Sequence, residues 1–277
     1  MGRLLIDYGA SRCRYVIETS EGELSGEFKS ADKDLESFIC LELESSRETL
    51  EAVHIAYAGQ VVNGNIYSAP NVDADHTRLK SVIERRFNIP VKIENDLKCA
   101  ALAEYHAREK CVSLFAAYIG TGFGGALVEE ERLLRGNSNM AGEVGHIPFK
   151  KAPFLCGCGK DDCVEIYCSG KALVEWVAYY GLECVPTLEA IELSNDEKAA
   201  LILQNFYDAL SHAVSTIVTL FNPTYLILGG AVINNNPMLE HYVQKSVQNH
   251  SFLPAAKDIK IETTRLNNGC LEGTKWL

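Results

Sequence analysis

A short cysteine-rich segment has the residue types and spacing of a metal site. Cys156, Cys158 and Cys163 form a C-x-C-x4-C pattern, and His146 lies upstream of it. Three thiolates and one imidazole complete a tetrahedral zinc shell with no position for water, which is the arrangement of a structural site. The alternative is chance clustering in a chain with 10 cysteines. We favour zinc because the loop is polar and rich in glycine, whereas core cysteines belong to apolar strands and helices.

Two acidic residues flank this predicted zinc loop. Glu143 precedes the histidine, and Glu165 follows the last cysteine. A bound metal would hold both carboxylates in one place. Polar groups held in fixed positions are what a site for a polyhydroxylated ligand requires. The segment therefore predicts a structural zinc ion that supports a polar binding site.

Two glycine-containing turns are candidate phosphate sites. They are D-Y-G-A-S-R at 7–12 and G-T-G-F-G-G at 120–125, each between strand-like runs. Glycine and small hydroxyl residues let a phosphate approach the backbone N–H groups. The second turn matches G-x-G-x-x-G, but a dinucleotide fold needs a helix directly after it, and 126–128 continues as a strand. The sequence also lacks a Walker motif and the H-R-D and D-F-G triplets of protein kinases. Plain hairpin glycines remain the alternative for both turns.

Further polar and glycine residues stand at predicted strand ends. Asn95 and Asp96 lie between a strand and a helix, where an aspartate is commonly an N-cap. Asp96 becomes a candidate base if a binding cleft passes this strand end. Asn71 lies in a polar loop and is a turn residue by default. Gly229 and Gly230 allow close approach of a flat group such as a nucleoside, or form the entry to a helix.

Strand-like and helical runs alternate, which predicts the α/β class. The order β-β-β-α-β-α-β-α in the first half begins again with an apolar strand at 112–119. We expect a small domain over 1–110 and a large domain over 111–266 that contains the zinc loop. No linker rich in proline or serine separates them, so we expect face-to-face packing with a cleft between. The expected strands are 3–7, 13–19, 23–28, 53–58, 91–94, 112–119, 124–130, 132–134, 225–228 and 259–263, and the main helices 32–50, 77–87, 97–108, 171–180, 194–221 and 238–248.

Charge and hydropathy exclude two classes of partner. A net charge of −11 argues against nucleic acid, whose binding needs a basic surface. An anionic small ligand is still compatible, because backbone N–H groups and a metal can hold phosphates. No apolar run has membrane-spanning length, so we expect no membrane partner. The first residues enter a strand pattern without a signal-peptide core, which predicts a cytoplasmic protein with reduced cysteines.

Together these motifs resemble the ROK family of sugar kinases, within the actin, Hsp70 and hexokinase superfamily. Within it, the chain is most similar to D-allose kinase-like or glucokinase-like members. The resemblance implies a two-domain actin-like ATPase fold, related to ribonuclease H, with the C-terminal helix 267–277 packed back on the small domain. The similar segments are 7–12, 58–59 with 70–71, 94–96, 120–125, 141–146, 156–165, 229–230 and 268–273.

The resemblance also implies an activity and a set of residues. The chain would be an ATP-dependent kinase for the 6-hydroxyl of an aldohexose, such as glucose, allose or an N-acetylhexosamine, with Asp96 as the catalytic base. Its cofactors would be structural Zn²⁺ and Mg²⁺ with ATP, and a homodimer is expected from the resemblance alone. The implied sugar-binding residues are Asn71, Asn95, Asp96, Glu143, His146 and Glu165. The implied nucleotide-binding residues are Asp7, Gly9, Ser11, Arg12, Gly120, Thr121, Gly122, Gly229 and Gly230, with His146, Cys156, Cys158 and Cys163 as metal ligands.

Some positions depart from the family pattern. In the first phosphate turn, Ala10 replaces a glycine, and Ser11 and Arg12 replace threonine and lysine. A methyl group at Ala10 would weaken nucleotide binding if its φ must be positive. Asp162 replaces a glycine of the zinc loop, which a left-handed conformation would tolerate. The altered turn motivates a second hypothesis, a catalytically weak sugar-sensing ROK protein.

Overall fold

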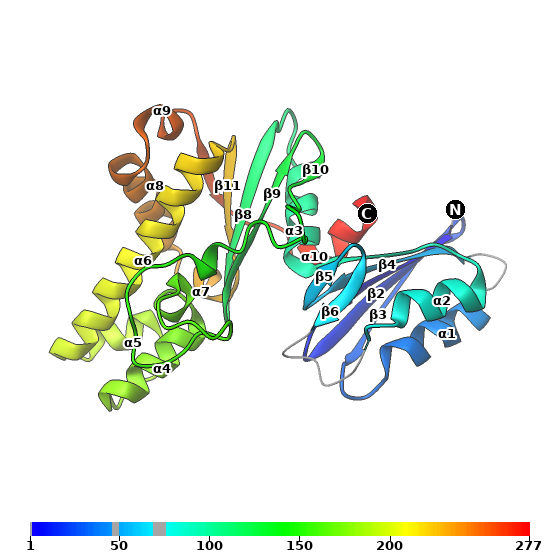
Figure 1. The fold of residues 1–277 in the computed structure, drawn as a ribbon, viewed down its shortest axis with the longest axis horizontal. Helices are drawn as coiled ribbons and strands as arrows, with labels where there is room; N and C mark the ends of the chain where they lie inside the picture. The colour runs from blue at the N-terminus through cyan, green and yellow to red at the C-terminus, as the bar shows by residue number, and fades with distance from the viewer. Residues whose placement is uncertain (1, 46–49, 69–75) are drawn as a thin grey trace. The chain divides into compact units, whose positions relative to one another are not determined.

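The computed structural model describes residues 2–45, 50–68 and 76–277. It divides into two compact units, and each is built on a five-stranded sheet, which confirms the predicted α/β class (Figure 1). Unit 1 contains Met1–Glu109, Leu133–Ala141 and Leu266–Leu277, and unit 2 contains Lys110–Arg132 and Gly142–Arg265.

The sheet of unit 1 has the order β3-β2-β1-β4-β7. The first three strands form an antiparallel meander, and β4 and β7 add to β1 in parallel. A small hairpin of β5 and β6 follows β4 in the chain. The bounds are β1 (Gly2–Tyr8), β2 (Arg12–Thr19), β3 (Gly22–Lys29), β4 (Leu50–Tyr57), β5 (Gln60–Val62), β6 (Asn65–Ser68) and β7 (Val91–Asn95).

Helices cover both faces of this sheet. On one face, α1 (Leu35–Ser45) and α2 (Leu79–Phe87) pack with Leu4 and Ile6 of β1 in one apolar core. Because successive side chains of a strand point to opposite faces, Asp7 points to the other face. There α3 (Asp96–His106) and α10 (Gly269–Gly273) contact the sheet (Figure 1). The helix predicted over 32–50 was too long, because it ends at Ser45 and Leu50 already begins β4.

The closing segment of the chain supports the helix that begins at Asp96. Helix α10 packs directly against α3. A Cβ atom at Gly273 would lie 1.7 Å from the carbonyl oxygen of Cys99, so no larger residue fits at this crossing. The glycine therefore allows the two helices to approach backbone to backbone.

The segment Leu133–Ala141, which we placed in the large domain, clusters with unit 1. The physical reason is a buried polar network around Asn139. Its side-chain amide donates to Glu94 Oε1 at 2.6 Å and to the carbonyl of Val61 at 2.8 Å, and its Oδ1 accepts from Lys98 Nζ at 2.9 Å. Buried polar groups of this kind are stable only when they are paired. The network thus holds the segment against β7 and α3.

We expect Asn139→Ala to lower the free energy of unfolding by roughly 2–4 kcal/mol, because it leaves buried polar groups unpaired. Asn139 also has a left-handed backbone, with φ of 63°. Asn63→Ala is the matched control, since this exposed residue has φ of 51° and carries the backbone strain alone. Equal losses in the two variants, measured by chemical denaturation, would contradict a stabilising network.

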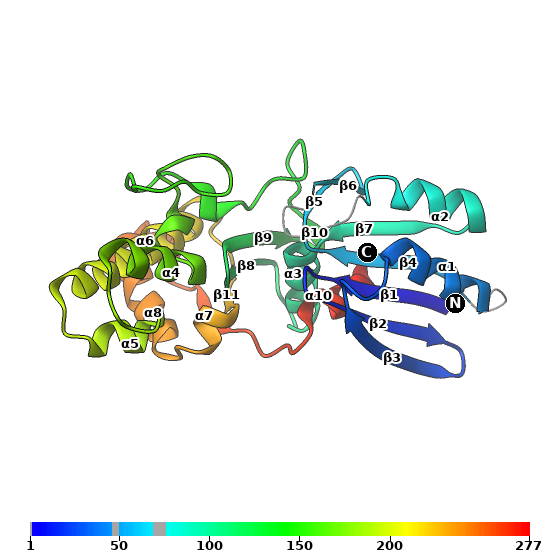
Figure 2. The same ribbon diagram turned by 90° about the horizontal axis from the view of Figure 1, so that it is seen from below.

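The sheet of unit 2 repeats the same plan, with the order β10-β9-β8-β11-β12. Its strands β9, β8 and β11 lie side by side (Figure 2). Strands β8 and β9 are an antiparallel hairpin, and β8, β11 and β12 are parallel. The carboxyl ends of β8 and β11 therefore meet at one edge of the sheet. The bounds are β8 (Ser113–Ile119), β9 (Phe123–Glu129), β10 (Arg132–Leu133), β11 (Tyr225–Gly229) and β12 (Lys260–Thr263).

The long helix α6 (Glu197–Phe221) forms the centre of the core of unit 2 and contacts α4, α5 and α8 (Figure 1). It begins three residues later than predicted, because the Asp196 side chain accepts from the N–H of Lys198 and caps it. In the described ranges, no helix is both long and apolar enough to span a membrane. The other helices are α4 (Gly170–Tyr180), α5 (Leu188–Leu193), α7 (Ala231–Asn234), α8 (Met238–His250) and α9 (Leu253–Ala256), with short 3-10 turns at Val144–His146, Val164–Ile166 and Thr274–Trp276.

Candidate functional site

The predicted site residues are divided between the two units. Unit 1 contains the first glycine turn with Asp7, and the pair Asn95 and Asp96. Unit 2 contains the second glycine turn, the zinc loop, and the carboxylates Glu143 and Glu165. Asn71 lies outside the described residues.

Asp96 is held at the start of α3 by its neighbours. Asn95 caps the helix, because its side-chain oxygen accepts from the N–H groups of Leu97 and Lys98. The capping role that we considered for Asp96 thus belongs to Asn95. The Asn95 amide also donates to Asp96 Oδ1 at 3.0 Å and to the carbonyl of Gly59 at 3.1 Å. These contacts fix the orientation of the Asp96 carboxylate.

The surroundings of Asp96 raise the pKa of its carboxyl above the value in water. Burial raises the pKa of this carboxyl from 3.8 to about 6, and the nearby Asp7 carboxylate contributes in the same direction. Hydrogen bonds from the Leu97 N–H and the Asn95 amide oppose part of the shift. A carboxyl with a pKa near the working pH suits proton transfer.

Two cations at the start of β2 pair with carboxylates of the neighbouring strands β1 and β3. Arg12, which we expected at the nucleotide, pairs with Glu27 at 2.9 Å. Arg14 instead contacts the largely buried Asp7, with Nη1 3.3 Å from Oδ2. Burial raises the pKa of Asp7, and the Arg14 guanidinium opposes this. Sequence reasoning missed Arg14, although the hairpin register that sets Asp7 opposite Arg14 could have indicated it.

The backbone of this turn accommodates its unusual residues. Gly9 donates its N–H to the carbonyl of Arg12 at 2.9 Å, and Ser30 Oγ donates to the carbonyl of Gly9 at 2.6 Å. Ala10 is not among the described residues with positive φ, so its methyl group causes no backbone strain. Ser11 and Ala10 are both exposed at the tip of the turn. Backbone strain at Ala10 is therefore absent in the ligand-free chain, and its effect on nucleotide binding stays a prediction.

The second turn is shorter than predicted, because Phe123 already begins β9 and only Gly120–Gly122 connects the strands. The first residues of α4 dock on it, with Gly170 N–H donating to the carbonyl of Gly120 at 2.7 Å and Lys171 N–H to that of Thr121 at 3.1 Å. The N–H groups of Thr121 and Gly122 have no hydrogen-bond partner within the part of the chain that the structure describes. They lie at the turn as available donors for an anion.

Glu165 connects the zinc loop to this turn. Its Oε2 accepts from the N–H of Phe123 at 2.8 Å, and its Oε1 lies 3.4 Å from Cys156 Sγ. A Cβ atom at Gly122 would lie 2.5 Å from Glu165 Oε2, so a larger residue there would have to displace this carboxylate from its bond to Phe123. The carboxylate predicted to bind a sugar thus also positions the glycine turn.

In the ligand-free protein, we expect Gly122→Ala to lower the free energy of unfolding by roughly 1–3 kcal/mol, since its methyl group displaces the Glu165 carboxylate. The matched control is Gly120→Ala, where a Cβ would meet its nearest atom at 3.9 Å. Denaturant unfolding of both variants tests this contact. Equal stability of the two would show that Gly122 does not pack against Glu165.

The four predicted metal ligands are brought together. One ligand atom from each of His146, Cys156, Cys158 and Cys163 lies within 4.8 Å of the others. His146 Nδ1 is 3.5 Å from Cys156 Sγ, and Cys158 Sγ is 3.4 Å from Cys163 Sγ. Bonds of about 2.3 Å to sulfur place tetrahedral ligands about 3.7 Å apart, so the set fits one zinc ion. The four groups could therefore hold a metal ion.

The zinc loop reaches this geometry without the left-handed aspartate that we considered. Asp162 is not among the described residues with positive φ, whereas Gly159 has φ of 89°. Asp162 accepts the N–H of Phe149 through its carbonyl at 2.6 Å. Burial, with the nearby Glu165 carboxylate adding to it, raises the pKa of the Cys156 thiol to about 11. A bound cation would reverse this preference, because metals bind the thiolate form.

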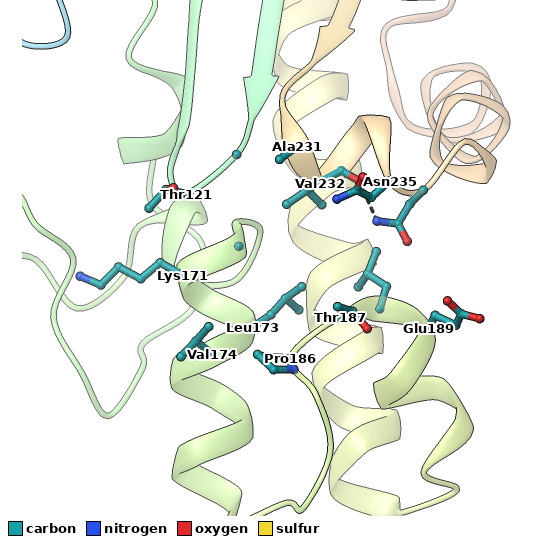
Figure 3. A pocket seen from close by; sticks show the side chains of 14 residues that line it. Thr121, Lys171, Leu173, Val174, Pro186, Thr187, Glu189, Ala231, Val232 and Asn235 are labelled. Carbon is teal, nitrogen blue, oxygen red and sulfur yellow. Dashed lines mark hydrogen bonds between the residues drawn. The ribbon is translucent and has the colours of Figure 1, made fainter. Parts of the chain in front are cut away.

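A cavity of about 670 Å³ opens in unit 2 at the carboxyl ends of β8 and β11 (Figure 3). Gly120 and Thr121 of the glycine turn form one wall. The others come from the start of α4, from the loop before α5, and from α7. In parallel sheets this edge is where ligands commonly bind. The sequence analysis missed most of this lining, namely Gly170, Lys171, Leu173, Val174, Pro186, Thr187, Leu188, Glu189, Ala231, Val232, Asn235 and Asn236.

Gly229 and Gly230, predicted at a nucleoside, do not line this cavity themselves but directly precede Ala231, which does. Gly230 has φ of 91° and turns the chain from β11 into α7. The buried Asn236 donates to the carbonyl of Val232 at 2.7 Å and fixes the α7 turn. The glycines thus shape the turn that leads into α7, one wall of the cavity.

Comparison with known proteins gives a consistent result. A family model described as "ROK family" matches residues 6–277. The glucokinase of Streptomyces coelicolor is 28% identical over 87% of this chain and 85% of its own length. An N-acetyl-D-glucosamine kinase of Vibrio cholerae is 31% identical over 72% of this chain and 70% of its own. The structure of a ROK family glucokinase from Streptomyces griseus, in complex with glucose and AMPPNP, superposes with a TM-score of 0.73 at 25% identity, over 99% of this chain and 98% of that one. This likeness confirms the predicted two-domain actin-like ATPase fold.

Proposed function

The chain belongs to the ROK family, and from this premise we propose that it is an ATP-dependent hexose kinase that phosphorylates the 6-hydroxyl of an aldohexose. Its matched relatives include a glucokinase and an N-acetyl-D-glucosamine kinase. The environment of Asp96 carries the proposal: the carboxylate is oriented by Asn95 and has a pKa of about 6. Such a group can take a proton from an alcohol at neutral pH.

In this proposal ATP binds in unit 2. The adenosine occupies the cavity beside α7, whose volume is within the range of about 300–1,000 Å³ usual for small-molecule sites. The N–H groups of Thr121 and Gly122 then donate to the phosphates, beside the N-terminus of α4, which favours negative charge. Glu165 holds the turn in shape through its bond to Phe123.

The sugar hydroxyls are bound by Asn71, Asn95, Glu143, His146 and Glu165 in the proposal. Asp96 accepts the proton of the 6-hydroxyl as that oxygen forms a bond to the γ-phosphorus, and the bond from phosphorus to the bridging oxygen breaks to release ADP. Little covalent work is left to the protein, so catalysis depends on positioning and on stabilising charge.

Two metal ions belong to the proposal. His146, Cys156, Cys158 and Cys163 would hold Zn²⁺, which when bound cross-links the loop that carries Glu165. Binding through Nδ1 of His146, the ring nitrogen nearest to Cys156, leaves Nε2 for a sugar hydroxyl. Asp7 would lie at the hydration shell of Mg²⁺, which when bound with ATP neutralises phosphate charge. Asp7 suits this role because it is a largely buried carboxylate beside a second one, Asp96.

The pKa of Asp96 predicts a pH profile. The base must be ionised, so kcat/KM for the sugar should fall about tenfold per pH unit below about 6 and level off above it. Initial rates between pH 5 and 8, at saturating ATP, measure this. An acidic limb near pH 4, the usual value of an exposed aspartate, would contradict the proposed environment of the base.

The activity itself is tested with a panel of sugars. We expect sugar-dependent ADP release with at least one of glucose, allose, mannose, N-acetylglucosamine and N-acetylmannosamine. The second candidate, a catalytically weak sugar sensor, is favoured by the first turn, where Arg12 pairs with Glu27 and Arg14 with Asp7. Tight sugar binding without turnover of any of the five would overturn the kinase and support the sensor.

A further inference from the structure

A second cavity lies within unit 1, at the edge of its sheet. It has a volume of about 420 Å³ and borders β7, the turn between β5 and β6, and the segment Leu133–Ala141. Three cationic side chains line it, namely Lys80 of α2, Lys92 of β7 and Arg135. Asp96 is not among the lining residues. The cavity is therefore separate from the carboxylate to which we assign catalysis.

The charge of this cavity is opposite to that of the chain. Its three cationic side chains lie beside two anionic groups, the Glu94 side chain and the terminal carboxylate of Leu277, in a chain whose net charge is −11. Grouping like charges is unfavourable unless an anion is nearby. Among the described residues, Lys80 finds a carboxylate only at 3.9 Å, in Glu84, and its side chain is 29% exposed. Among the described residues, no carboxylate lies close enough to form a short ion pair with Lys80.

Among the described residues, only one N–H group of Arg135 has a hydrogen-bond acceptor. Its Nε donates to Glu94 Oε2 at 3.1 Å, and the two terminal nitrogens form no hydrogen bond or ion pair with the residues described in the structure. Lys92 donates through Nζ to the main-chain oxygen of Leu277 at 2.6 Å. A guanidinium with an unused edge, near two ammonium groups, matches the geometry and charge of a phosphate group.

Glu94 fixes the position of this arginine. Its Oε1 accepts from the Asn139 amide and from the N–H of Asn95, which leaves Oε2 for Arg135. The carboxylate is buried, with 4% of its surface exposed, so the pair has a defined geometry. The arginine head is thereby held at the cavity while its side chain remains 52% exposed to an incoming ligand.

We propose that this cavity binds a small molecule through a phosphate group, which Arg135 and Lys80 hold and Lys92 attracts. The volume exceeds that of a phosphate ion alone, so a phosphate monoester of a small metabolite fits the chemistry. The inference concerns binding only and does not depend on the proposed kinase activity.

The test is equilibrium binding of inorganic phosphate to the full chain by calorimetry at low salt. We expect Lys80→Met and Arg135→Met each to raise the Kd at least about tenfold. Among the described residues, Lys80 forms an ion pair only with Glu84, at 3.9 Å, so Lys80→Met should fold normally. Arg135→Lys keeps the positive charge but loses the paired N–H donors of the guanidinium. We expect its Kd to lie between those of the unaltered chain and Arg135→Met.

Two control variants separate this site from others. Lys171→Met alters the cavity of unit 2, and Lys151→Met removes a surface charge that is 83% exposed. We expect both to leave the Kd for phosphate at the cavity of unit 1 unchanged. The proposal is overturned if the unaltered chain binds no phosphate, if Lys171→Met alone loses binding, or if all variants are weakened equally.

Discussion

Asp96→Asn should lower kcat by about 10²–10⁴-fold, because the amide cannot accept the proton of the attacking hydroxyl. The amide has nearly the same shape and keeps an oxygen for the bond from Asn95, so the KM for the sugar should change little. The measurement is steady-state ADP release with the sugar that the unaltered chain turns over. Asp196→Asn, a neutralised aspartate at the start of another helix, is the matched control and should retain full activity.

Measuring the free energy of unfolding of Asp96→Asn tests whether a folding defect, and not the loss of the base, lowers its kcat. The pKa of Asp96 is higher in the folded protein than in the unfolded chain. Its protonated form therefore adds to the free energy of unfolding at low pH, and this contribution is lost as the pH rises through about 6. The neutral asparagine does not carry the cost of a buried, ionised carboxylate. The variant should therefore be at least as stable as the unaltered chain at pH 8. A variant with normal activity, or one that loses activity only by unfolding, would contradict the role of Asp96 as base.

Of the changes considered, loss of the zinc ion should lower the free energy of unfolding most. We expect Cys163→Ser to lose the bound metal and to lower the free energy of unfolding by about 3 kcal/mol or more, because the buried Cys163 is one of four converging ligands. Metal analysis of the unaltered chain should find about one zinc ion per molecule, the content expected for one closed site. Since Glu165 joins the loop to the second turn, chelation should also weaken nucleotide binding.

The control for this variant is Cys184→Ser, a half-buried cysteine outside the ligand set. It should keep the metal and nearly the full stability. A metal-free chain of unchanged stability and activity would contradict the structural role of zinc.

Most of the fold could be predicted from local patterns. The strand 112–119 is a continuous apolar run and the helix near 194–221 has clear helical periodicity, and both are present as β8 and α6. The short elements α5, α7 and α9 were missed, because four to six residues carry too little periodicity. The helix predicted over 32–50 ran on into β4, since an amphipathic pattern does not mark where a strand takes over.

The candidate site was predictable where chemistry depends on residue type and spacing. The four metal ligands converge as predicted because they lie close together in the chain. The pairing of Arg14 with Asp7 depends on hairpin register, and the place of Asn139 depends on contacts across more than 40 residues. Neither follows from composition or motif. The sugar, the homodimer and the cytoplasmic location stay predictions, because they depend on contacts beyond a single chain or on side-chain positions within about 0.5 Å.

The central claim is that Asp96 activates the hydroxyl of a sugar that the zinc loop also binds. A crystal structure of the chain with AMPPNP and the sugar that it turns over tests this most directly. We predict the 6-hydroxyl at about 2.6–3.2 Å from the Asp96 carboxylate, with Glu165 and His146 on other hydroxyls of the same sugar. A sugar bound with its 6-hydroxyl away from Asp96, or without contact to the zinc loop, would contradict the account.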